Sequence, residues 1–158
     1  MNKIKTFEEL EKIVQEAKVG SRKIVWTNGC FDLLHVGHVK YLQEAKKLGN
    51  ILIVGINSDN SVKKLKGEGK PIQNEGDRSE IISSLESVDY VTIFSELTAE
   101  NYLLRLKPDI FAKGGDYSLN SINKTEKGAV ESYGGKISFV PLVEGKSTSS
   151  IVEKLKNG

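Results

Sequence analysis

The spacing of apolar residues along the chain predicts strands that alternate with helices. Apolar side chains recur three or four positions apart between Phe7 and Ala17, which indicates an amphipathic helix that ends near Gly20. The run at residues 51–56 is continuously apolar and rich in β-branched residues, as is typical of a strand buried on both faces of a parallel sheet. Runs that we interpret as strands begin near residues 23, 51, 89, 109 and 136.

Helical spacing between these runs predicts the connections. The first strand, residues 23–26, leads into a helix that begins near Gly37, buries Val39, Leu42 and Ala45, and has Gly49 as its C-cap. Residues 62–71 are predicted to form a loop that carries four lysines. The remaining helices are expected over residues 75–86, from a cap at Thr98 to a stop at Pro108, within 123–133, and after residue 150.

This alternation favours a Rossmann-like, doubly wound α/β fold, with a five-stranded parallel sheet and helices on both faces. In such folds ligands bind beyond the carboxyl ends of the strands, where the strand order reverses. The 158 residues are expected to form a single domain, residues 1–158, in which residues 1–20 supply an N-terminal packing helix.

Composition narrows the class of protein. A net charge of +2 gives no reason to expect nucleic acid as a partner, and the apolar runs are too short to span a membrane. The N-terminus has no apolar segment of the signal-peptide type, and the single cysteine, Cys30, agrees with a reducing compartment. We therefore expect a cytoplasmic protein.

Residues 27–38 read TNGCFDLLHVGH and contain both histidines of the chain, His35 and His38. A helix that begins here presents unpaired backbone N–H groups and the positive end of its dipole, which favours a bound phosphate. Gly37 has no Cβ and lets an anion approach the backbone. The three-residue spacing places both imidazoles on one side of the first turn, where both could donate to the same phosphoryl group.

Two other interpretations of these residues are open. The histidines could be core residues that hydrogen-bond to the backbone. Asp32, His35 and His38 could instead bind a metal ion, with Cys30 as a fourth ligand. We favour the phosphate site, because the motif lies at a strand-to-helix junction and the chain has no further His or Cys. Cys30 is expected to be a small packed residue and not a nucleophile.

Three further segments could contact anions. The lysines Lys63, Lys64, Lys66 and Lys70 could hold phosphates, although a solvated loop would have the same composition. Arg78 lies in the first turn of a helix, where the dipole disfavours a cation, so it needs another reason to be there. Residues 113–117, KGGDY, and the hydroxyls at 147–150 are compatible with a ligand loop and a second anion site, or with an ordinary turn and helix cap.

The pattern G-x-F-D-x-x-H-x-G-H at residues 29–38 resembles the signature of the cytidylyltransferase-like nucleotidyltransferases, and the resemblance extends from about Ile4 to the C-terminus. It implies the strand order 3-2-1-4-5, transfer of a nucleotidyl group without a covalent intermediate, and a homodimer. It also implies Mg²⁺ bound with ATP, held by phosphates and water, with no set of protein ligands. Asp32 would brace the loop.

The resemblance also implies roles for individual residues. His35 and His38 would bind the α and β phosphates, and Lys66 and Arg78 would balance the remaining charge; these are the expected catalytic residues. The expected nucleotide-binding residues are Thr27, Asn28, Gly29, Cys30, Phe31, Gly37, Lys113, Gly115, Asp116, Ser147, Thr148 and Ser149.

Within this family, the string TNGCFDLLHVGH most resembles the adenylyltransferases that activate D-glycero-β-D-manno-heptose 1-phosphate for lipopolysaccharide synthesis. Members that use CTP commonly read R-T-E-G where residues 142–145 read LVEG, which favours adenine. The implied partners are ATP and heptose 1-phosphate, and a separate sugar kinase would supply the sugar phosphate. Glycerol-3-phosphate cytidylyltransferase, FMN adenylyltransferase and a nucleotide-binding regulatory module are the alternatives.

Overall fold

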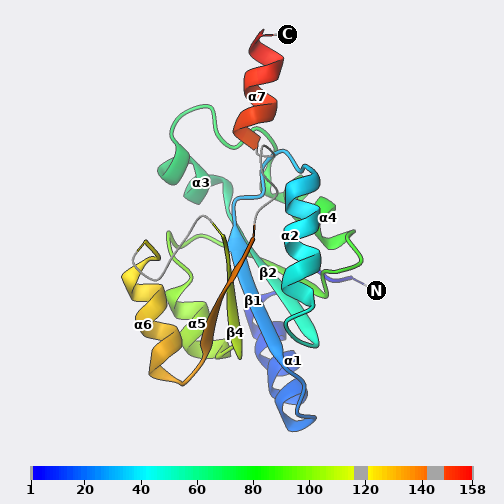
Figure 1. The fold of residues 1–158 in the computed structure, drawn as a ribbon, viewed down its shortest axis with the longest axis vertical. Coiled ribbons are helices and arrows are strands. Elements are labelled where there is room, and N and C mark those ends of the chain that lie inside the picture. The colour runs from blue at the N-terminus through cyan, green and yellow to red at the C-terminus, as the bar shows by residue number, and fades with distance from the viewer. Residues whose placement is uncertain (1, 116–120, 142–147, 158) are drawn as a thin grey trace.

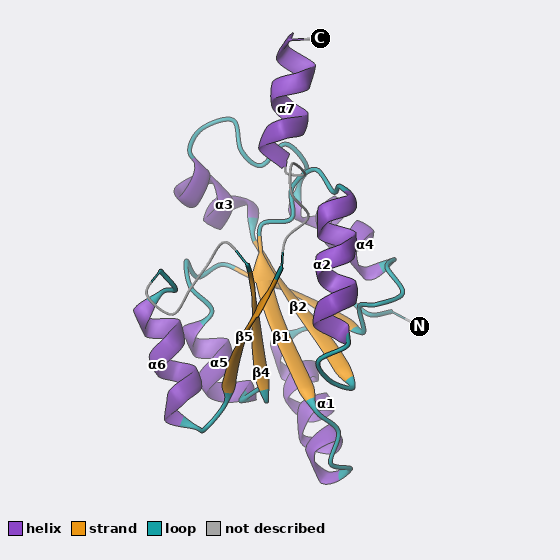
Figure 2. Cartoon of the chain, in the orientation of Figure 1, coloured by secondary structure: helices purple, strands orange, loops and turns teal. Residues whose placement is uncertain are grey.

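A computed structural model describes residues 2–115, 121–141 and 148–157. Its centre is a five-stranded sheet, in which every pair of neighbouring strands is parallel and the order is β3-β2-β1-β4-β5 (Figures 1 and 2). The predicted fold class and strand order are confirmed. The strands are β1 (Ile24–Gly29), β2 (Ile51–Asn57), β3 (Tyr90–Phe94), β4 (Ile110–Gly114) and β5 (Lys136–Val140).

Helices cover both faces of this sheet (Figure 2). One buried cluster joins Leu10, Leu103 and Val130 of three helices to the strands, and a second joins Leu42 and Ile82 of two others to the opposite face. The helices in the described part of the chain are α1 (Phe7–Val19), α2 (Val36–Lys46), α3 (Asp59–Lys66), α4 (Glu75–Ser83), α5 (Glu100–Leu106), α6 (Lys124–Ser132) and α7 (Thr148–Asn157).

The first cluster is built around Trp26, whose ring stacks on Tyr102 with centroids 5.7 Å apart. Gly55 on β2 makes room for this ring, because a Cβ at that position would lie 2.5 Å from Trp26 Cζ2. The centre of the sheet is therefore packed without spare volume.

Helix boundaries differ from the sequence prediction at several places; α4, for example, ends at Ser83 and not at residue 86. Residues 59–66 form α3, whereas the many lysines of residues 62–71 had led us to predict a loop there. α2 ends at Lys46 with Lys47 as its C-cap, so Gly49 lies beyond the helix, and Val39, which was expected to be buried, is only half-buried. Thr98 is not the cap of α5, because Ala99 is the N-cap residue and has no side-chain cap bond. Its backbone N–H is accepted instead by a carboxylate from α6.

β1 is longer than predicted at its carboxyl end. Thr27, Asn28 and Gly29 belong to the strand and lie in register with Val54, Gly55 and Ile56 of β2. The loop toward α2 therefore begins at Cys30.

The N-terminal segment lies along β3. Ile4 forms a parallel bridge with Val91, where Lys5 N–H donates to the Val91 carbonyl at 2.8 Å and Val91 N–H donates to the Lys3 carbonyl at 2.9 Å. Among the described residues, no helix has the length and apolar character needed to cross a membrane.

Candidate active site

A cavity of about 720 Å³ opens at the carboxyl ends of the strands. Asn28 and Gly29 from β1, Asn57 from β2 and Lys113 from β4 lie in its wall, so it occupies the position that the strand order predicts. The other residues in the wall are Cys30, Phe31, Asp32, His38, Tyr41, Val62, Leu65, Lys66, Lys70, Leu97, Thr98, Ser121, Asn123 and Glu126.

The two histidines form the first turn of α2. His35 is the N-cap residue, and its Nδ1 accepts the Gly37 N–H at 3.0 Å; His38 Nδ1 accepts the His35 N–H at 3.2 Å. The imidazole centroids lie 3.9 Å apart, which confirms the prediction that both rings lie on one side of this turn. A neutral imidazole that accepts through Nδ1 carries its proton on Nε2, so each ring in this state has Nε2–H as its remaining donor.

The environment of His38 keeps it neutral. Burial, and secondarily the neighbouring His35, lower the pKa of His38 from 6.5 to about 4. The ring also lies 5.6 Å from the ring of Phe31, which contributes an apolar neighbour. His38 therefore meets a ligand at neutral pH as a hydrogen-bond donor without a net charge.

The loop between β1 and α2 is braced by Asp32. This carboxylate is 8% exposed, and its two oxygens accept the backbone N–H groups of Ile72 at 2.7 Å and Gln73 at 2.9 Å. Phe31, one position before it, has a left-handed backbone with φ of 47°. A bulky residue in that conformation is strained and persists only where the surroundings fix it. Asp32 therefore braces the loop, as we expected from the sequence.

The metal interpretation of this loop is not supported. Among residues 2–115, 121–141 and 148–157 there is no group of three His, Cys, Asp or Glu side chains that could hold a metal ion. Asp32 uses its oxygens for the backbone, and both histidines use Nδ1 within their own turn. Burial raises the pKa of the Cys30 thiol, which disfavours the thiolate that a metal or a nucleophilic role would need.

Arg78 has a different place from the one expected. Its side chain is fully buried, and Nη1 donates to the carbonyls of Cys30 at 2.7 Å and Asn57 at 2.8 Å. Nε donates to the Gln73 carbonyl at 2.9 Å, and Nη2 pairs with Asp59 at 2.8 Å. In this structure Arg78 joins the ends of β1 and β2 to the segment after α3. A phosphate contact would require these bonds to break, so we replace the expected catalytic role with a positioning role.

Two of the four lysines after β2 face the cavity. Lys66, the last residue of α3, and Lys70 line it. Lys63 instead lies 3.4 Å from Glu68 in an exposed ion pair. The structure thus separates the lysines that composition alone left equivalent.

Several predicted site residues do not line the cavity, and His35 is one of them, although His38 in the same turn does. Thr27 is 1% exposed and its Oγ1 lies 2.7 Å from the Tyr41 hydroxyl and 3.0 Å from the Ala112 carbonyl. Gly37 is buried, with its N–H already donated to His35. Gly115 lies in an exposed turn. These contacts place Thr27 and Gly37 in the supporting layer beneath the cavity.

Other predicted residues remain as predictions. Asp116 and Ser147 lie outside the described residues. Thr148 and Ser149 are the first two residues of α7, and their place at a helix N-terminus agrees with the predicted hydroxyl-rich helix start. Figure 1 shows α7 on the side of the sheet where the cavity opens.

Sequence reasoning missed several residues of the wall. Tyr41 lies on α2 and Asn57 on β2, both of which the sequence predicted. Asn57 could have been identified, because a polar residue at the carboxyl end of a buried parallel strand lies where ligands bind in this fold. Glu126, 4% exposed, had no signal, because an acidic residue in the first turn of a helix is expected on dipole grounds alone.

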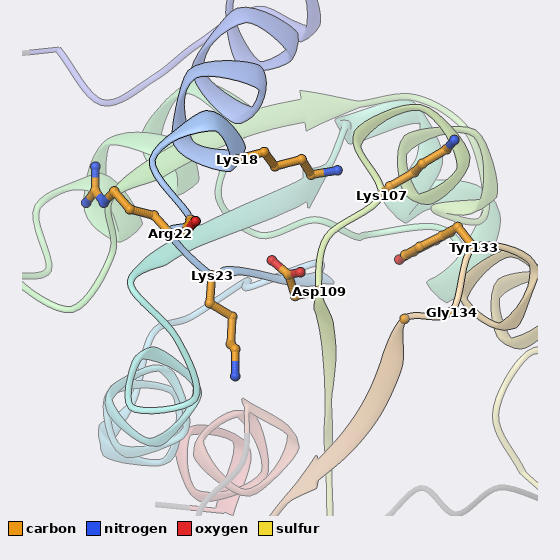
Figure 3. A pocket seen from close by; sticks show the side chains of 9 residues that line it. Lys18, Arg22, Lys23, Lys107, Asp109, Tyr133 and Gly134 are labelled. Atoms are coloured by element: carbon orange, nitrogen blue, oxygen red, sulfur yellow. The ribbon is translucent and has the colours of Figure 1, made fainter.

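A second, smaller cavity of about 420 Å³ lies at the amino ends of the strands (Figure 3). Lys18 and Lys107 lie at the ends of α1 and α5, where cations offset the negative ends of the helix dipoles. Figure 3 shows Arg22 and Lys23 pointing in different directions. None of the predicted site residues lines it, so we place the active site at the carboxyl ends.

The fold and the basic cavity at its switch point define a doubly wound α/β domain of the nucleotide-binding class. Residues 26–154 match the family described as Cytidylyltransferase-like. The chain belongs to this family, as the motif at residues 29–38 indicated.

Relatives of known name agree with this assignment. Over 97% of its length the chain is 48% identical to the bifunctional protein HldE of Geobacter metallireducens, and over 98% it is 49% identical to that of Nitratiruptor sp.. It spans about a third of these relatives, 31% and 32% of their lengths.

Two solved structures share the fold. The lipopolysaccharide core biosynthesis protein of Thermoplasma volcanium is 31% identical, with a TM-score of 0.63 over 79% of this chain and 99% of that one. Pantoate-beta-alanine ligase of Francisella tularensis, 17% identical with a TM-score of 0.64, covers 96% of this chain and 72% of its own, and supports the fold alone.

Proposed function

We propose that this chain transfers the adenylyl group of ATP to D-glycero-β-D-manno-heptose 1-phosphate, giving ADP-heptose and pyrophosphate for lipopolysaccharide or surface-glycan synthesis. The observation that carries the proposal is the near-complete match, 48% identity over 97% of the chain, to proteins named HldE. The name of the Thermoplasma relative, a lipopolysaccharide core biosynthesis protein, supports the same pathway. The segment at residues 142–145, which lacks the arginine common in CTP users, favours ATP.

In the proposed reaction an oxygen of the sugar phosphate attacks the α-phosphorus of ATP. The new P–O bond forms as the bond from the α-phosphorus to the bridging oxygen breaks, and pyrophosphate leaves with that electron pair. This chemistry depends on positioning and on neutralising the charge of the transition state, more than on proton transfer. The cavity suits both needs, because its wall is fixed by buried hydrogen bonds and carries several cations.

His38 would donate Nε2–H to the phosphoryl oxygens, and His35 would hold the turn and add a second donor. Lys66 and Lys70 would supply positive charge around the phosphates, and Lys113, whose charge is partly offset by Glu126 4.0 Å away, would contact the nucleotide. Asp32 and Arg78 would keep the loops that carry these groups in one arrangement. Thr148 and Ser149 would bind the leaving pyrophosphate at the start of α7, together with Ser147.

Mg²⁺ is expected to arrive with ATP and to neutralise part of the phosphate charge. The described residues offer no group of three side chains for a metal ion, so we assign Mg²⁺ to phosphate oxygens and water. A homodimer and a separate kinase that makes the sugar phosphate belong to the same proposal.

Pyrophosphate release tests the proposal. The purified chain with Mg²⁺ is given ATP or CTP, each with heptose 1-phosphate or with glycerol 3-phosphate. Release with ATP and the heptose phosphate alone is the expected result. Release with CTP and glycerol 3-phosphate would overturn the substrate assignment, and nucleotide binding without release in any combination would indicate a regulatory module.

A further inference from the structure

The wall of the cavity contains the carboxylate of Glu126, although an acidic side chain is not expected in a site that binds only phosphates. Among the described residues, the wall has two acidic residues, Asp32 and Glu126. Both oxygens of Asp32 accept backbone N–H groups, which leaves Glu126 as the acid that could contact a ligand. Glu126 forms a long ion pair with Lys113, 4.0 Å away, so the carboxylate offsets the charge of that lysine, and its remaining acceptor positions suit an uncharged, hydroxylated part of the substrates.

Glu126 is held firmly in this position. It is 4% exposed, Oε2 accepts the Ala99 N–H at 2.8 Å, and Oε1 lies 4.0 Å from Lys113 Nζ. The first bond explains why α5 needs no side-chain cap of its own. A carboxylate has about four acceptor positions, and the cap uses one of them. A cap alone would not require the residue to reach the cavity wall.

Apart from Lys113, the neighbouring wall is polar and uncharged. Thr98 before α5, and Ser121 and Asn123 before α6, lie beside Glu126 in the lining of the cavity. Hydroxyl and amide groups around a fixed carboxylate are suited to a polyol, because each hydroxyl of a ligand can donate to an oxygen and accept from a side chain.

We propose that Glu126 accepts hydrogen bonds from a vicinal diol of one of the two substrates. The shared chemistry is two adjacent hydroxyls, which both the ribose of the nucleotide and the acceptor sugar possess. The inference rests on the proposed function only in its choice of acceptor sugar. Glu126 is thus a specificity-determining residue that selects hydroxylated ligands, whereas the histidines and lysines select phosphates.

The test uses Glu126→Gln, which keeps an oxygen for the Ala99 N–H and removes the charge. Glu131→Gln is the matched control, since Glu131 lies on the same helix in an exposed i,i+4 pair with Lys127. Binding of ATP, 2′-deoxy-ATP, 3′-deoxy-ATP and heptose 1-phosphate to the full chain is measured by calorimetry in the presence of Mg²⁺.

A diol partner predicts that Glu126→Gln weakens one substrate by about 10- to 100-fold, the scale of a charge-assisted hydrogen bond, and leaves the other unchanged. If ribose is the partner, a deoxy nucleotide binds wild type and variant equally weakly. If the sugar is the partner, ATP affinity stays constant and heptose phosphate affinity falls. Binding of both substrates within twofold of wild type, with only a lower melting temperature, would reduce Glu126 to a helix cap and overturn the proposal.

These readouts separate the two proposals. ATP binding needs no turnover, so absence of pyrophosphate release with every acceptor would refute the adenylyltransferase while a ribose contact could still be measured. Wild-type protein that binds neither ATP nor the sugar phosphate would overturn both.

Discussion

His35 and His38 cap the same helix turn. The His35 ring accepts the Gly37 N–H through Nδ1, the His38 ring accepts the His35 N–H through Nδ1, and the two ring centroids lie 3.9 Å apart. Serine or aspartate is the usual residue at such a position. The use of two imidazoles therefore satisfies the helix N-terminus and at the same time orients two Nε2–H groups from one turn.

His38→Ala is expected to lower kcat by about 100- to 1,000-fold, because removing one preorganised donor to a transition-state oxyanion has effects of this size. Initial rates of pyrophosphate release measure it, and circular dichroism establishes that the variant is folded. Val36→Ala, at an exposed position of the same turn, is the control and should retain wild-type rates. A loss below tenfold in His38→Ala would remove this residue from the catalytic set.

The pKa of His38 predicts how stability depends on pH. The unfolded chain binds a proton at His38 below about pH 6.5, whereas the folded chain binds it only below about pH 4. Between these values the unfolded state holds more protons, so His38 makes the free energy of unfolding fall as the pH falls from about 6.5 to 4. NMR titration of the imidazole should show a midpoint near 4; a midpoint of 6 or above would refute the buried neutral ring.

Arg78→Ala is expected to lower the free energy of unfolding by about 3 kcal/mol, since it leaves buried carbonyl oxygens and the Asp59 carboxylate without their donor. Urea denaturation measures the change. Arg105→Ala is the matched control: its ion pair with Glu11 is exposed, and its contact with the Phe7 ring is modest, so the loss should stay near about 1 kcal/mol. Equal losses in the two variants would contradict the positioning role.

Lys66→Ala should raise the KM for the nucleotide or the sugar phosphate by about tenfold, because a charge-assisted contact to phosphate is lost. Lys63→Ala removes the same charge from the same helix, but Lys63 lies outside the cavity wall and should leave both KM values unchanged. The difference between the variants should shrink as salt is added. Indistinguishable kinetics would place the phosphates elsewhere.

Gly55→Ala should destabilise the core by about 1 to 3 kcal/mol, because the new Cβ would lie 2.5 Å from Trp26 and the neighbouring side chains have no room to move. Gly128→Ala, in α6, meets no atom within 4 Å and should stabilise the chain by about 1 kcal/mol through helix propensity. Thermal and urea unfolding of the two variants test the opposite signs.

The sequence was sufficient for most of the fold and for the arrangement of the two histidines in one helix turn. Buried β-branched runs such as residues 51–56 are typical of central strands, and the strand order followed from the resemblance. Local spacing also fixed the relation of His35 to His38, because one helix turn contains both. α3 was missed although Ser58 as N-cap, Asp59 in the first turn and Gly67 after the last residue are standard helix signals. The prediction gave more weight to the four nearby lysines, which are typical of a solvated loop.

Long-range contacts were beyond local reasoning. Arg78 donates to carbonyls 21 and 48 positions away, and only the folded structure shows that these carbonyls occupy its hydrogen-bond donors. Glu126 likewise reaches Ala99 across 27 positions. Residue type and spacing indicate what a side chain can do, whereas its partners depend on how the loops at the ends of the strands are assembled.

The pairing of Ile4 with Val91 has a consequence for association between chains. An uncovered edge strand can be extended by a strand from another protein, which is a common route to aggregation. Lys3 and Lys5 already satisfy the outward N–H and carbonyl of Val91, so the β3 margin is protected at this residue. A strand from a second protein could pair with β3 at Val91 only by displacing the N-terminal segment.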